Sequence, residues 1–471
     1  MRVAIGVDVG TSGVKAIAVA EDGEVLARRE VAYPISSPRP GWSEQDPEDW
    51  WRATEQALDG LTGQDVAGIG LSGQMHGLVA LDASDRVIRP AILWNDQRTA
   101  AECAEIERRI GLDRLVQLTG NRALTGFTAP KLLWMRAHEP QAYARIASVM
   151  LPKDYVRLRL TGERATDAAD ASGTLLLDVA RRRWSSEVIE ALKLDAAWLP
   201  RLLESPEASG RTADGIAVAA GAGDQAAGAL GVGVDRPGPL SVVLGTSGVV
   251  FATLPAFAAD PLARVHAFCH AVPGAWHAMG VMLSAAGSLD WLRGVAAPGV
   301  GFPALIAEAE RWAPGVEGLT FLPYLTGERT PHADPDARGA FAGLSVRHDR
   351  GALVRAVLEG VACGLRDCLD LIGELPESVL EHGLASGGGA RSELWLAIVA
   401  SVLGLPLQRV AVEEGAAYGA ALLGGVAGGT WGDVHEAVAA CVRRGDVIEP
   451  VPEWIEPYRE LVARYRALYP F

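Results

Sequence analysis

The sequence predicts an α/β protein made of two similar halves, and two observations carry that prediction. Apolar segments rich in β-branched residues alternate with segments of helical periodicity, which is typical of the α/β class. The pentapeptide GTSGV occurs twice, at 10–14 and at 245–249, half a chain apart. Each copy follows an apolar segment and precedes another. We therefore expect a duplicated domain in which each half opens with a strand, a tight turn and a second strand.

The first elements are a set of short strands. Segments 3–8, 14–20 and 25–30 are apolar or β-branched, and the first Gly-Thr-Ser-Gly turn and the pair Asp22-Gly23 separate them. The chain is thus expected to open as an antiparallel meander rather than as a Rossmann unit, in which a helix follows the first strand.

A helix and a buried strand follow the meander. The segment 47–58 is predicted as a helix because a proline and two acidic residues occupy its first turn. The apolar segment 66–72 is predicted as a strand that ends at the sequence GQMHG. Strand and helix patterns alternate up to a Pro/Gly-rich stretch at 234–239, where we place the join. The predicted domains are residues 1–236 and 237–471.

Composition excludes several classes of function. The formal net charge is −15 and the pI is about 5.1, so nucleic acid is not an expected partner. None of the lysines stands in a GxxxxGK[ST] loop, which excludes a P-loop NTPase. The five cysteines are irregularly spaced and form no CxxC pair, which argues against disulfides or a zinc site. The first apolar run is short and no run is long enough to span a membrane, so a cytoplasmic protein without a membrane partner is predicted.

The two Gly-Thr-Ser-Gly turns are candidate phosphate sites. A glycine-rich turn leaves successive N–H groups unobstructed and the hydroxyls add donors, which makes an anion nest. Either turn alone would be interpreted as a plain β-hairpin. Two such turns facing each other across a cleft would hold the phosphates of a nucleotide without any lysine. The predicted phosphate-binding residues are Gly10, Thr11, Ser12 and Gly13 in the first turn and Gly245, Thr246 and Ser247 in the second.

Two carboxylates are candidates for metal binding and catalysis. Asp8 directly precedes the first turn, where it would repel phosphate unless a cation such as Mg²⁺ lies between them; the alternative is an Asx cap of the turn. Asp224 is the only charged residue in AAGAGDQAAGAL, where a glycine cluster ends a strand and a helix begins. An aspartate at a helix start is commonly just a cap, but the small neighbours leave room for a substrate. We therefore predict Asp224 as the base that accepts a hydroxyl proton during phosphoryl transfer.

Three further segments complete the candidate site. The sequence SGGGAR at 386–391 precedes a helix predicted at 393–402, and its glycines would let adenosine lie against the backbone. Met75 and His76 stand at the carboxyl end of a strand, where ligands of α/β proteins gather, although a structural role for the histidine is equally consistent. Trp42, in the loop WSEQDP, either lines a sugar site or caps the helix that follows.

Together these residues resemble the FGGY family of carbohydrate kinases, which belongs to the superfamily of actin, hexokinase and the heat-shock chaperones. The resemblance runs from about Val7 to about Gly425. Several of the matching stretches are long, so the assignment is specific. They are WSEQDP (42–47), GQMHG (73–77), PAILWND (90–96), GFTAPKLLW (126–134), LPKDY (151–155), HAFCH (266–270), FLPYLTGERTP (321–331) and GGGARS (387–392).

The resemblance implies two ribonuclease-H-like domains, with mixed sheets flanked by helices, around a central cleft that closes on substrate. It implies transfer of a phosphoryl group from ATP, with Mg²⁺, to D-xylulose in xylose catabolism. The family's roles map onto Asp224 as catalytic base, onto Asp8 and Asp224 as metal-linked residues, and onto Met75 and His76 as sugar contacts. The family also suggests a homodimer. The nucleotide contacts are placed on Gly387, Gly388, Gly389, Arg391 and Ser392.

The choice of sugar depends on two pairs of residues. Glycerol kinases carry an Arg-Glu pair in place of Met75 and His76, so a ketopentose is preferred to glycerol. Many members that act on xylulose have Asp-Asn where this chain has Asp224 and Gln225, and Gln225 is included among the sugar contacts because its length would reshape the pocket. The alternatives are a kinase for another keto sugar or polyol, such as ribulose, ribitol, glycerol or gluconate, and a nucleotide-gated binding protein of the actin or chaperone kind.

Overall fold

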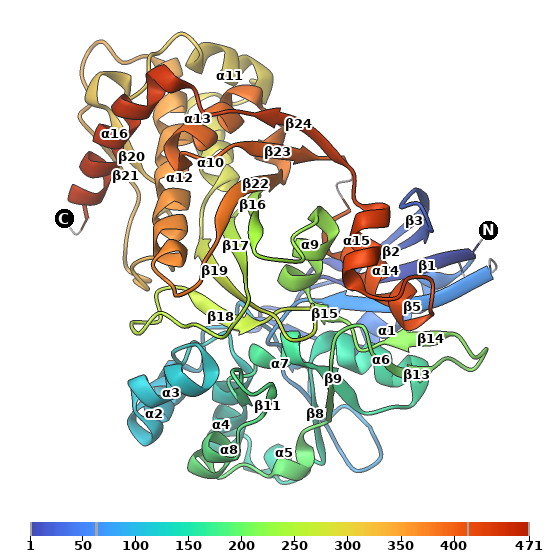
Figure 1. The fold of residues 1–471 in the computed structure, drawn as a ribbon. Helices are drawn as coiled ribbons and strands as arrows, with labels where there is room; N and C mark the ends of the chain where they lie inside the picture. The colour runs from blue at the N-terminus through green and yellow to red at the C-terminus, as the bar shows by residue number, and fades with distance from the viewer. Residues whose placement is uncertain (1, 62–64, 412–413, 470–471) are drawn as a thin grey trace.

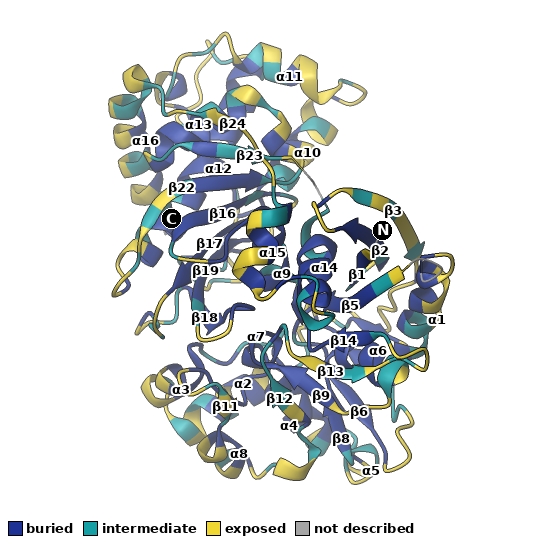
Figure 2. Ribbon diagram, turned by 45° about the vertical axis from the view of Figure 1, so that its right-hand side comes forward, coloured by how far each residue is buried: buried dark blue, intermediate teal, exposed yellow. Residues whose placement is uncertain are grey.

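The computed structural model of the chain describes residues 2–61, 65–411 and 414–469. Two sheets form its centre, one in each half of the chain, and helices cover their faces (Figure 1). A further group of helices and short strands from the first half lies below the sheets in that view. Buried residues concentrate in the sheets and in the helices between them, whereas the outer helices expose one side (Figure 2).

The first sheet contains the predicted meander. Its strands are β1 (Arg2–Val9), β2 (Gly13–Ala20), β3 (Val25–Ala32), β5 (Asp65–Gly73), β13 (Ala208–Arg211), β14 (Ala217–Ala219) and β15 (Ala222–Gly223). β1 pairs antiparallel with β2, and β2 with β3, while β5 runs parallel to β1 on its other side. The strand order is β13-β14-β5-β1-β2-β3, and β15 pairs with the end of β5.

The second sheet repeats this arrangement. Its strands are β16 (Gly238–Leu244), β17 (Gly248–Leu254), β18 (His266–Cys269), β19 (Trp276–Met282), β22 (Leu380–Ser386), β23 (Leu407–Val410) and β24 (Arg444–Ile448). β16 pairs antiparallel with β17 and parallel with β22, as β1 pairs with β2 and β5. Each GTSGV sequence therefore begins in the turn of an antiparallel strand pair, and the predicted two-part α/β fold is confirmed.

One helix connects the two halves. α14 (Gly415–Ala427) belongs to the second half in sequence, but it packs on β1 and β5 of the first sheet and on α9 (Asp224–Val232). Glycine permits this close approach, because a Cβ at Gly70 would lie 1.8 Å from the carbonyl oxygen of Ala420. The strands of the first sheet all precede residue 236, but α14, from the second half of the sequence, packs on them. The predicted domain boundary therefore stays a prediction.

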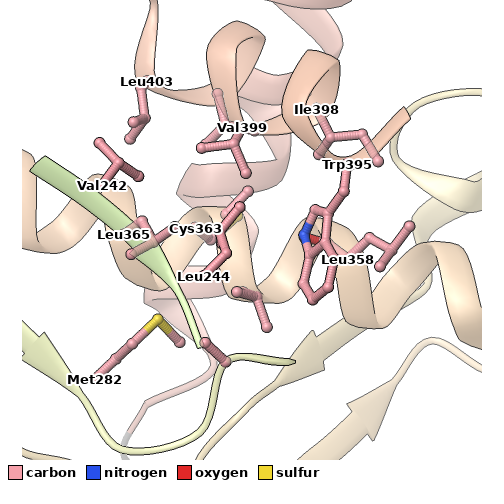
Figure 3. Close-up of a cluster of buried hydrophobic side chains, with 14 of the residues drawn as sticks. Val242, Leu244, Met282, Leu358, Cys363, Leu365, Trp395, Ile398, Val399 and Leu403 are labelled. Atoms are coloured by element: carbon pink, nitrogen blue, oxygen red, sulfur yellow. The ribbon is translucent and has the colours of Figure 1, made fainter. Parts of the chain in front are cut away.

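The core of the second half lies between its sheet and two helices, α12 (Arg350–Gly373) and α13 (Glu393–Leu403) (Figure 3). Leu244, at the end of β16, is fully buried in this core. Trp395 is 2% exposed, and its Nε1 donates a hydrogen bond to the carbonyl of Leu358 at 3.2 Å. This packing holds the end of β16, from which the second GTSGV turn extends.

The remaining elements surround the two sheets. Those of the first half are β4 (Glu44–Gln45), α1 (Pro47–Leu58), β6 (Val79–Leu81), β7 (Ala91–Ile92), α2 (Ala100–Ile110), α3 (Leu112–Thr119), α4 (Thr128–His138), α5 (Pro140–Tyr143), β8 (Ser148–Met150), α6 (Pro152–Thr161), β9 (Ala165–Asp167), α7 (Ala168–Ser172), β10 (Leu177–Asp178), β11 (Arg183–Trp184), α8 (Ser186–Leu192) and β12 (Arg201–Leu203). Those of the second half are α10 (Ala286–Ala296), α11 (Phe302–Ala309), β20 (Thr320–Leu322), β21 (Ala340–Ala342), α15 (Val434–Cys441) and α16 (Ile455–Ala467). The predicted helices are found as α1 and α13. Of the helices described, none has the length and apolarity that a membrane crossing requires.

The edge strand β18 of the second sheet docks on the first half (Figure 1). The amide of Cys269 donates to Ser172 Oγ at 3.0 Å, and Asn121 Nδ2 donates to the carbonyl of Ala267 at 3.0 Å. These hydrogen bonds join the HAFCH segment to α7 and to the loop after α3, so residues of both halves meet close to Met75 and His76.

Candidate active site

Three parallel strands of the first sheet end together. Ser72 of β5 pairs with Asp8 of β1 on one side and with Ala222 of β15 on the other. Asp224 directly follows β15, so the carboxylates of Asp8 and Asp224 reach the same edge of the sheet. Met75, two residues beyond β5, reaches it as well. Carboxyl ends of parallel strands are where open α/β sheets bind their ligands.

Asp224 has the properties of a general base. It opens α9 after Gly223, which occupies the N-cap position, so the carboxylate is not the cap of this helix. The side chain is partly exposed. Burial raises the pKa of the Asp224 carboxyl to about 7, the negative charge of Asp8 acts in the same direction, and hydrogen bonds from Gln225 oppose them. A carboxylate that titrates near neutral pH is suited to accept a proton from an alcohol.

Asp8 lies in surroundings that suit a cation. Ser72 Oγ donates to its Oδ1 at 2.7 Å. Burial raises the pKa of Asp8, while the Ser72 hydrogen bond and the charge of Lys15 lower it. Two neighbouring carboxylates disfavour each other's ionisation, and a cation between them removes that penalty. Oxygen ligands of this kind fit Mg²⁺, which usually takes one or two carboxylates and completes its shell with water and phosphate.

The first GTSGV turn directs its carbonyl groups toward the protein. Tyr33 Oη donates to the carbonyl of Gly10, and Gln45 Nε2 donates to that of Thr11 at 2.7 Å. In the part of the chain that the structure describes, the amides of Thr11 and Ser12 have no hydrogen-bond partner. The turn thus supplies donor groups of the kind that an anion nest needs, and its predicted role in phosphate binding stays a prediction.

The second turn is held in the same way. The amides of Ala285 and Gly287 donate to the carbonyl of Thr246 at 2.8 and 3.2 Å, and the start of α10 thereby supports the turn. The amides of Thr246 and Ser247 are again without a partner among the residues described. The two turns thus offer equivalent donor groups, one from each half of the chain.

A pocket adjoins the second turn. Gly387 follows β22 with a φ of 87°, and a Cβ there would lie 2.9 Å from the amide nitrogen of Gly245. The pocket has a volume of about 610 Å³, and residues of α10, α11 and α13 supply an apolar lining. Size, apolar walls and an adjacent anion nest are the features that an adenosine site needs. The predicted residues that line it are Gly388, Gly389, Arg391 and Ser392.

His76 is held in an uncommon backbone conformation. Its φ is 70°, and its carbonyl accepts hydrogen bonds from Thr128 Oγ1 at 3.0 Å and from Lys131 Nζ at 2.9 Å. Its Nδ1 lies 2.8 Å from the carbonyl oxygen of Gly173. A left-handed backbone at a non-glycine residue stores strain, and such positions cluster at functional sites.

Met75 lies between His76 and Asp224, the predicted base. A Cβ at Gly223, the residue before Asp224, would lie 2.7 Å from Met75 Cγ and 3.0 Å from its Sδ. The structure therefore places Met75 beside Asp224, with His76 next to it in the chain, and the role of this pair as sugar contacts stays a prediction. On the other side, the ring of His76 lies 4.7 Å from that of Phe127, so the pair stands between the carboxylate and an aromatic cluster.

Trp42 has a packing role that the sequence did not indicate. The guanidinium of Arg98 lies 3.6 Å from the centroid of its ring, and the ring of Trp134 lies 5.4 Å away. Asp46, rather than Trp42, caps α1 by accepting from an amide of the first turn. No described contact joins Trp42 to His76, so its place in a sugar site stays a prediction.

The sequence analysis missed the residues that support the site. Lys131 is 0% exposed, and burial lowers the pKa of its amine to about 7. Trp94 Nε1 donates to Thr11 Oγ1 at 3.0 Å, and Ser72 holds the Asp8 carboxylate. Lys131 and Trp94 both lie in the long stretches that carry the family resemblance. A lysine inside an otherwise apolar helix was the available signal, because lysine is almost never fully buried without a partner.

Comparison with known proteins decides to which group of enzymes this site belongs. The FGGY family of carbohydrate kinases is matched by its N-terminal domain at residues 3–231 and by its C-terminal domain at residues 240–428. The chain belongs to the FGGY family of carbohydrate kinases. This confirms the family predicted from the sequence, and it makes the chain an enzyme that phosphorylates a sugar.

Relatives of this FGGY kinase resemble it over nearly their whole length. It is 48% identical to the xylulose kinase of Escherichia coli (strain K12) over 443 residues, 90% of each chain. A xyloylose kinase from Brucella ovis matches the fold with a TM-score of 0.94, 42% identity and 99% coverage of both chains. The xylulose kinase from Rhodospirillum rubrum matches with a TM-score of 0.93 and 32% identity, covering 99% of this chain and 98% of that one.

Proposed function

We propose that this FGGY kinase catalyses the ATP-dependent phosphorylation of D-xylulose on O5, which yields D-xylulose 5-phosphate. The observation that carries the proposal is the position of Asp224. Its carboxylate, with a pKa raised to about 7, stands at the edge of the first sheet beside Met75 and close to Asp8. The xylulose kinases among the relatives support the choice of sugar.

In this proposal ATP lies between the two nests and the apolar pocket. Adenosine occupies the pocket next to Gly387, and the phosphates accept hydrogen bonds from the amides of Thr11 and Ser12 and of Thr246 and Ser247 in the two GTSGV turns. Asp8 and Asp224 would hold Mg²⁺ through their carboxylate oxygens, and the bound cation would neutralise phosphate charge. Lysine is not needed, because backbone amides supply the donor groups.

Asp224 then acts on the sugar hydroxyl. It accepts the proton of O5 as the phosphoryl group transfers in line. Met75 packs against Gly223 and limits where the sugar can lie, while Gln225 donates to the carboxylate and orients it. Positioning and charge neutralisation supply most of the rate enhancement. Closure of the halves on the sugar would exclude water and limit idle ATP hydrolysis.

A sugar panel tests this function directly. Purified protein is assayed for ADP release with D-xylulose, ribulose, ribitol, glycerol and gluconate, each with Mg²⁺ and with EDTA. The proposal expects the largest kcat/KM for D-xylulose and loss of turnover in EDTA. Equal or better turnover of another sugar would reassign the substrate. Tight ATP binding without sugar-stimulated turnover would instead favour a nucleotide-gated binding protein.

The proposal extends to the state of the protein in the cell. All five cysteines are free and buried, which fits a reducing cytoplasm. A homodimer is expected from the family, and sedimentation of the purified protein measures it. A monomeric sedimentation coefficient would remove the dimer from the proposal without affecting the assignment of the reaction.

A further inference from the structure

The segment GERTP (327–331), between β20 and β21, is anchored by the residues on either side of Arg329. Glu328 Oε1 accepts from the amide of Leu283 at 2.9 Å. Thr330 pairs with Val281 through two hydrogen bonds of 3.0 Å, one in each direction. Glu328 and Thr330 thus hold the segment to the end of β19. Arg329 lies between these two anchors, and its side chain shares none of their partners.

The guanidinium of Arg329 makes no hydrogen bond or ion pair with any residue that the structure describes. The residue is nevertheless half-buried, and desolvation lowers the pKa of its guanidinium. The neighbouring Glu328 directs its carboxylate to backbone amides instead. A guanidinium carries several N–H donors, and withdrawing them from water without acceptors is unfavourable. Such a group in a folded protein calls for an explanation, and a ligand that supplies acceptors is one.

Arg329 comes from the second half but lies close to the predicted sugar contacts of the first. Thr330 Oγ1 also donates to the carbonyl of Arg264 at 3.0 Å, two residues before His266. The ring of Phe127 lies 6.0 Å from the ring of His266 and 4.7 Å from that of His76. Burial lowers the pKa values of His76 and His266, and the charge of Arg329 contributes to both.

The order of groups along the site sets which end of a sugar Arg329 meets. Met75 packs beside Asp224. Arg329 lies on the side of His76 and His266, because its neighbour Thr330 bonds to the carbonyl of Arg264 and its charge acts on both imidazoles. A sugar whose phosphorylated hydroxyl faces Asp224 therefore presents its other end toward Arg329. This placement rests on the proposed function, in which Asp224 deprotonates that hydroxyl.

We propose that Arg329 binds the end of the sugar that is not phosphorylated and selects a ligand with a carbonyl or carboxylate oxygen there. A guanidinium only donates hydrogen bonds and a ketone oxygen only accepts them, so the two match. A polyol hydroxyl is satisfied by donors and acceptors alike and gains less from the same partner. Arg329 thus favours a 2-keto sugar over the corresponding polyol, and through it the second half of the chain contacts the sugar.

The test compares D-xylulose with xylitol, which lacks the carbonyl, in the wild type, Arg329→Ala and Arg329→Lys. Kd for each ligand is measured by calorimetry without nucleotide, and kcat/KM is measured with ATP. Loss of a hydrogen bond from a charged group predicts a rise of about 10- to 100-fold in Kd for D-xylulose in Arg329→Ala. The Kd for xylitol should change by less than about 3-fold. Arg329→Lys keeps the charge but not the planar fork, so its Kd should lie in between.

Two readouts separate this inference from loss of folding and from the proposed function. The melting temperature and the KM for ATP should match the wild type in both variants, as in the control Arg459→Ala on the exposed face of α16. Equal losses for D-xylulose and xylitol, no loss for either, or a wild type that binds neither would overturn the inference. Arg329-dependent binding of D-xylulose without its turnover would overturn the proposed function alone.

Discussion

In the proposed mechanism the carboxylate of Asp224 serves catalysis at the expense of stability, and the isosteric substitution Asp224→Asn separates the two effects. The amide keeps the shape of the side chain but cannot accept the sugar proton. We expect turnover of D-xylulose to fall by about 10²- to 10⁴-fold, the range for a lost general base. The KM for ATP should change little, because the proposed site holds the phosphates through backbone amides and adenosine through the apolar pocket.

The same substitution should stabilise the fold above neutral pH. The folded-state pKa of about 7 lies about three pH units above the ordinary value of 3.8, which corresponds to about 4 kcal/mol as an upper limit. Because the side chain is partly exposed, solvent screening reduces this to about 1–2 kcal/mol. Because the pKa of Asp224 is raised in the folded state, ionisation of its carboxyl destabilises the fold. This destabilisation is absent below about pH 4, grows as the pH rises, and is complete above about pH 7.

The measurement is a pair of series run between pH 5 and pH 8. Melting temperatures should show Asp224→Asn above the wild type at pH 8, with a smaller difference at pH 5. In the wild type, kcat/KM for the sugar should rise with pH as the base loses its proton, and bound Mg²⁺ should shift that rise below the pKa of about 7 of the metal-free site. Asp433→Asn, which replaces the cap of α15 with another good cap, is the matched control and should alter neither series. Near wild-type turnover in Asp224→Asn would refute the role of Asp224 as the base. A melting temperature of Asp224→Asn below that of the wild type at pH 8 would refute the claim that ionised Asp224 destabilises the fold.

Two further substitutions probe the supports of the site. Gly70→Ala places a methyl group 1.8 Å from the carbonyl oxygen of Ala420, and urea unfolding should show a loss of about 3 kcal/mol or more in the free energy of unfolding. The control Gly294→Ala lies in open space on α10 and should be neutral or stabilising. Equal urea midpoints for the two variants would contradict the close packing of α14. Lys131→Met removes the ammonium that donates a hydrogen bond to the carbonyl of His76. The KM for the sugar should rise by about 10-fold, and the KM for ATP should stay unchanged. A parallel rise in both constants would show that Lys131 supports the fold and not the sugar site.

Local patterns predicted much of the fold. The meander is found as β1, β2 and β3, and the helix expected at 47–58 is α1 with the same bounds. Apolar alternation, turn residues and capping residues act between near neighbours, so a single sequence carries that information. The repeated GTSGV also led to the correct equivalence of β1–β2 with β16–β17. Of the residues proposed for the site, Asp8 and Asp224 reach one edge of the first sheet because parallel strands end there.

Contacts between distant segments were not predictable in this way. Nothing near α14 indicates that it packs on the first sheet, because the requirement lies in glycines such as Gly70 some hundreds of residues earlier. The support of His76 by Lys131 and the anchoring of the segment around Arg329 to β19 likewise depend on contacts between residues far apart in the sequence. The packing of Trp42 against Arg98 was likewise not predicted, since the two residues are far apart in the sequence.

The sequence by itself determined the family and the duplicated strand–turn–strand units, and it predicted Asp224 as the catalytic carboxylate, because each depends on residues that are adjacent in the chain. The tertiary structure alone decided the ionisation of that carboxylate. A pKa of about 7 at Asp224 arises from burial and from the charge of Asp8, two influences that exist only once separate strands end side by side.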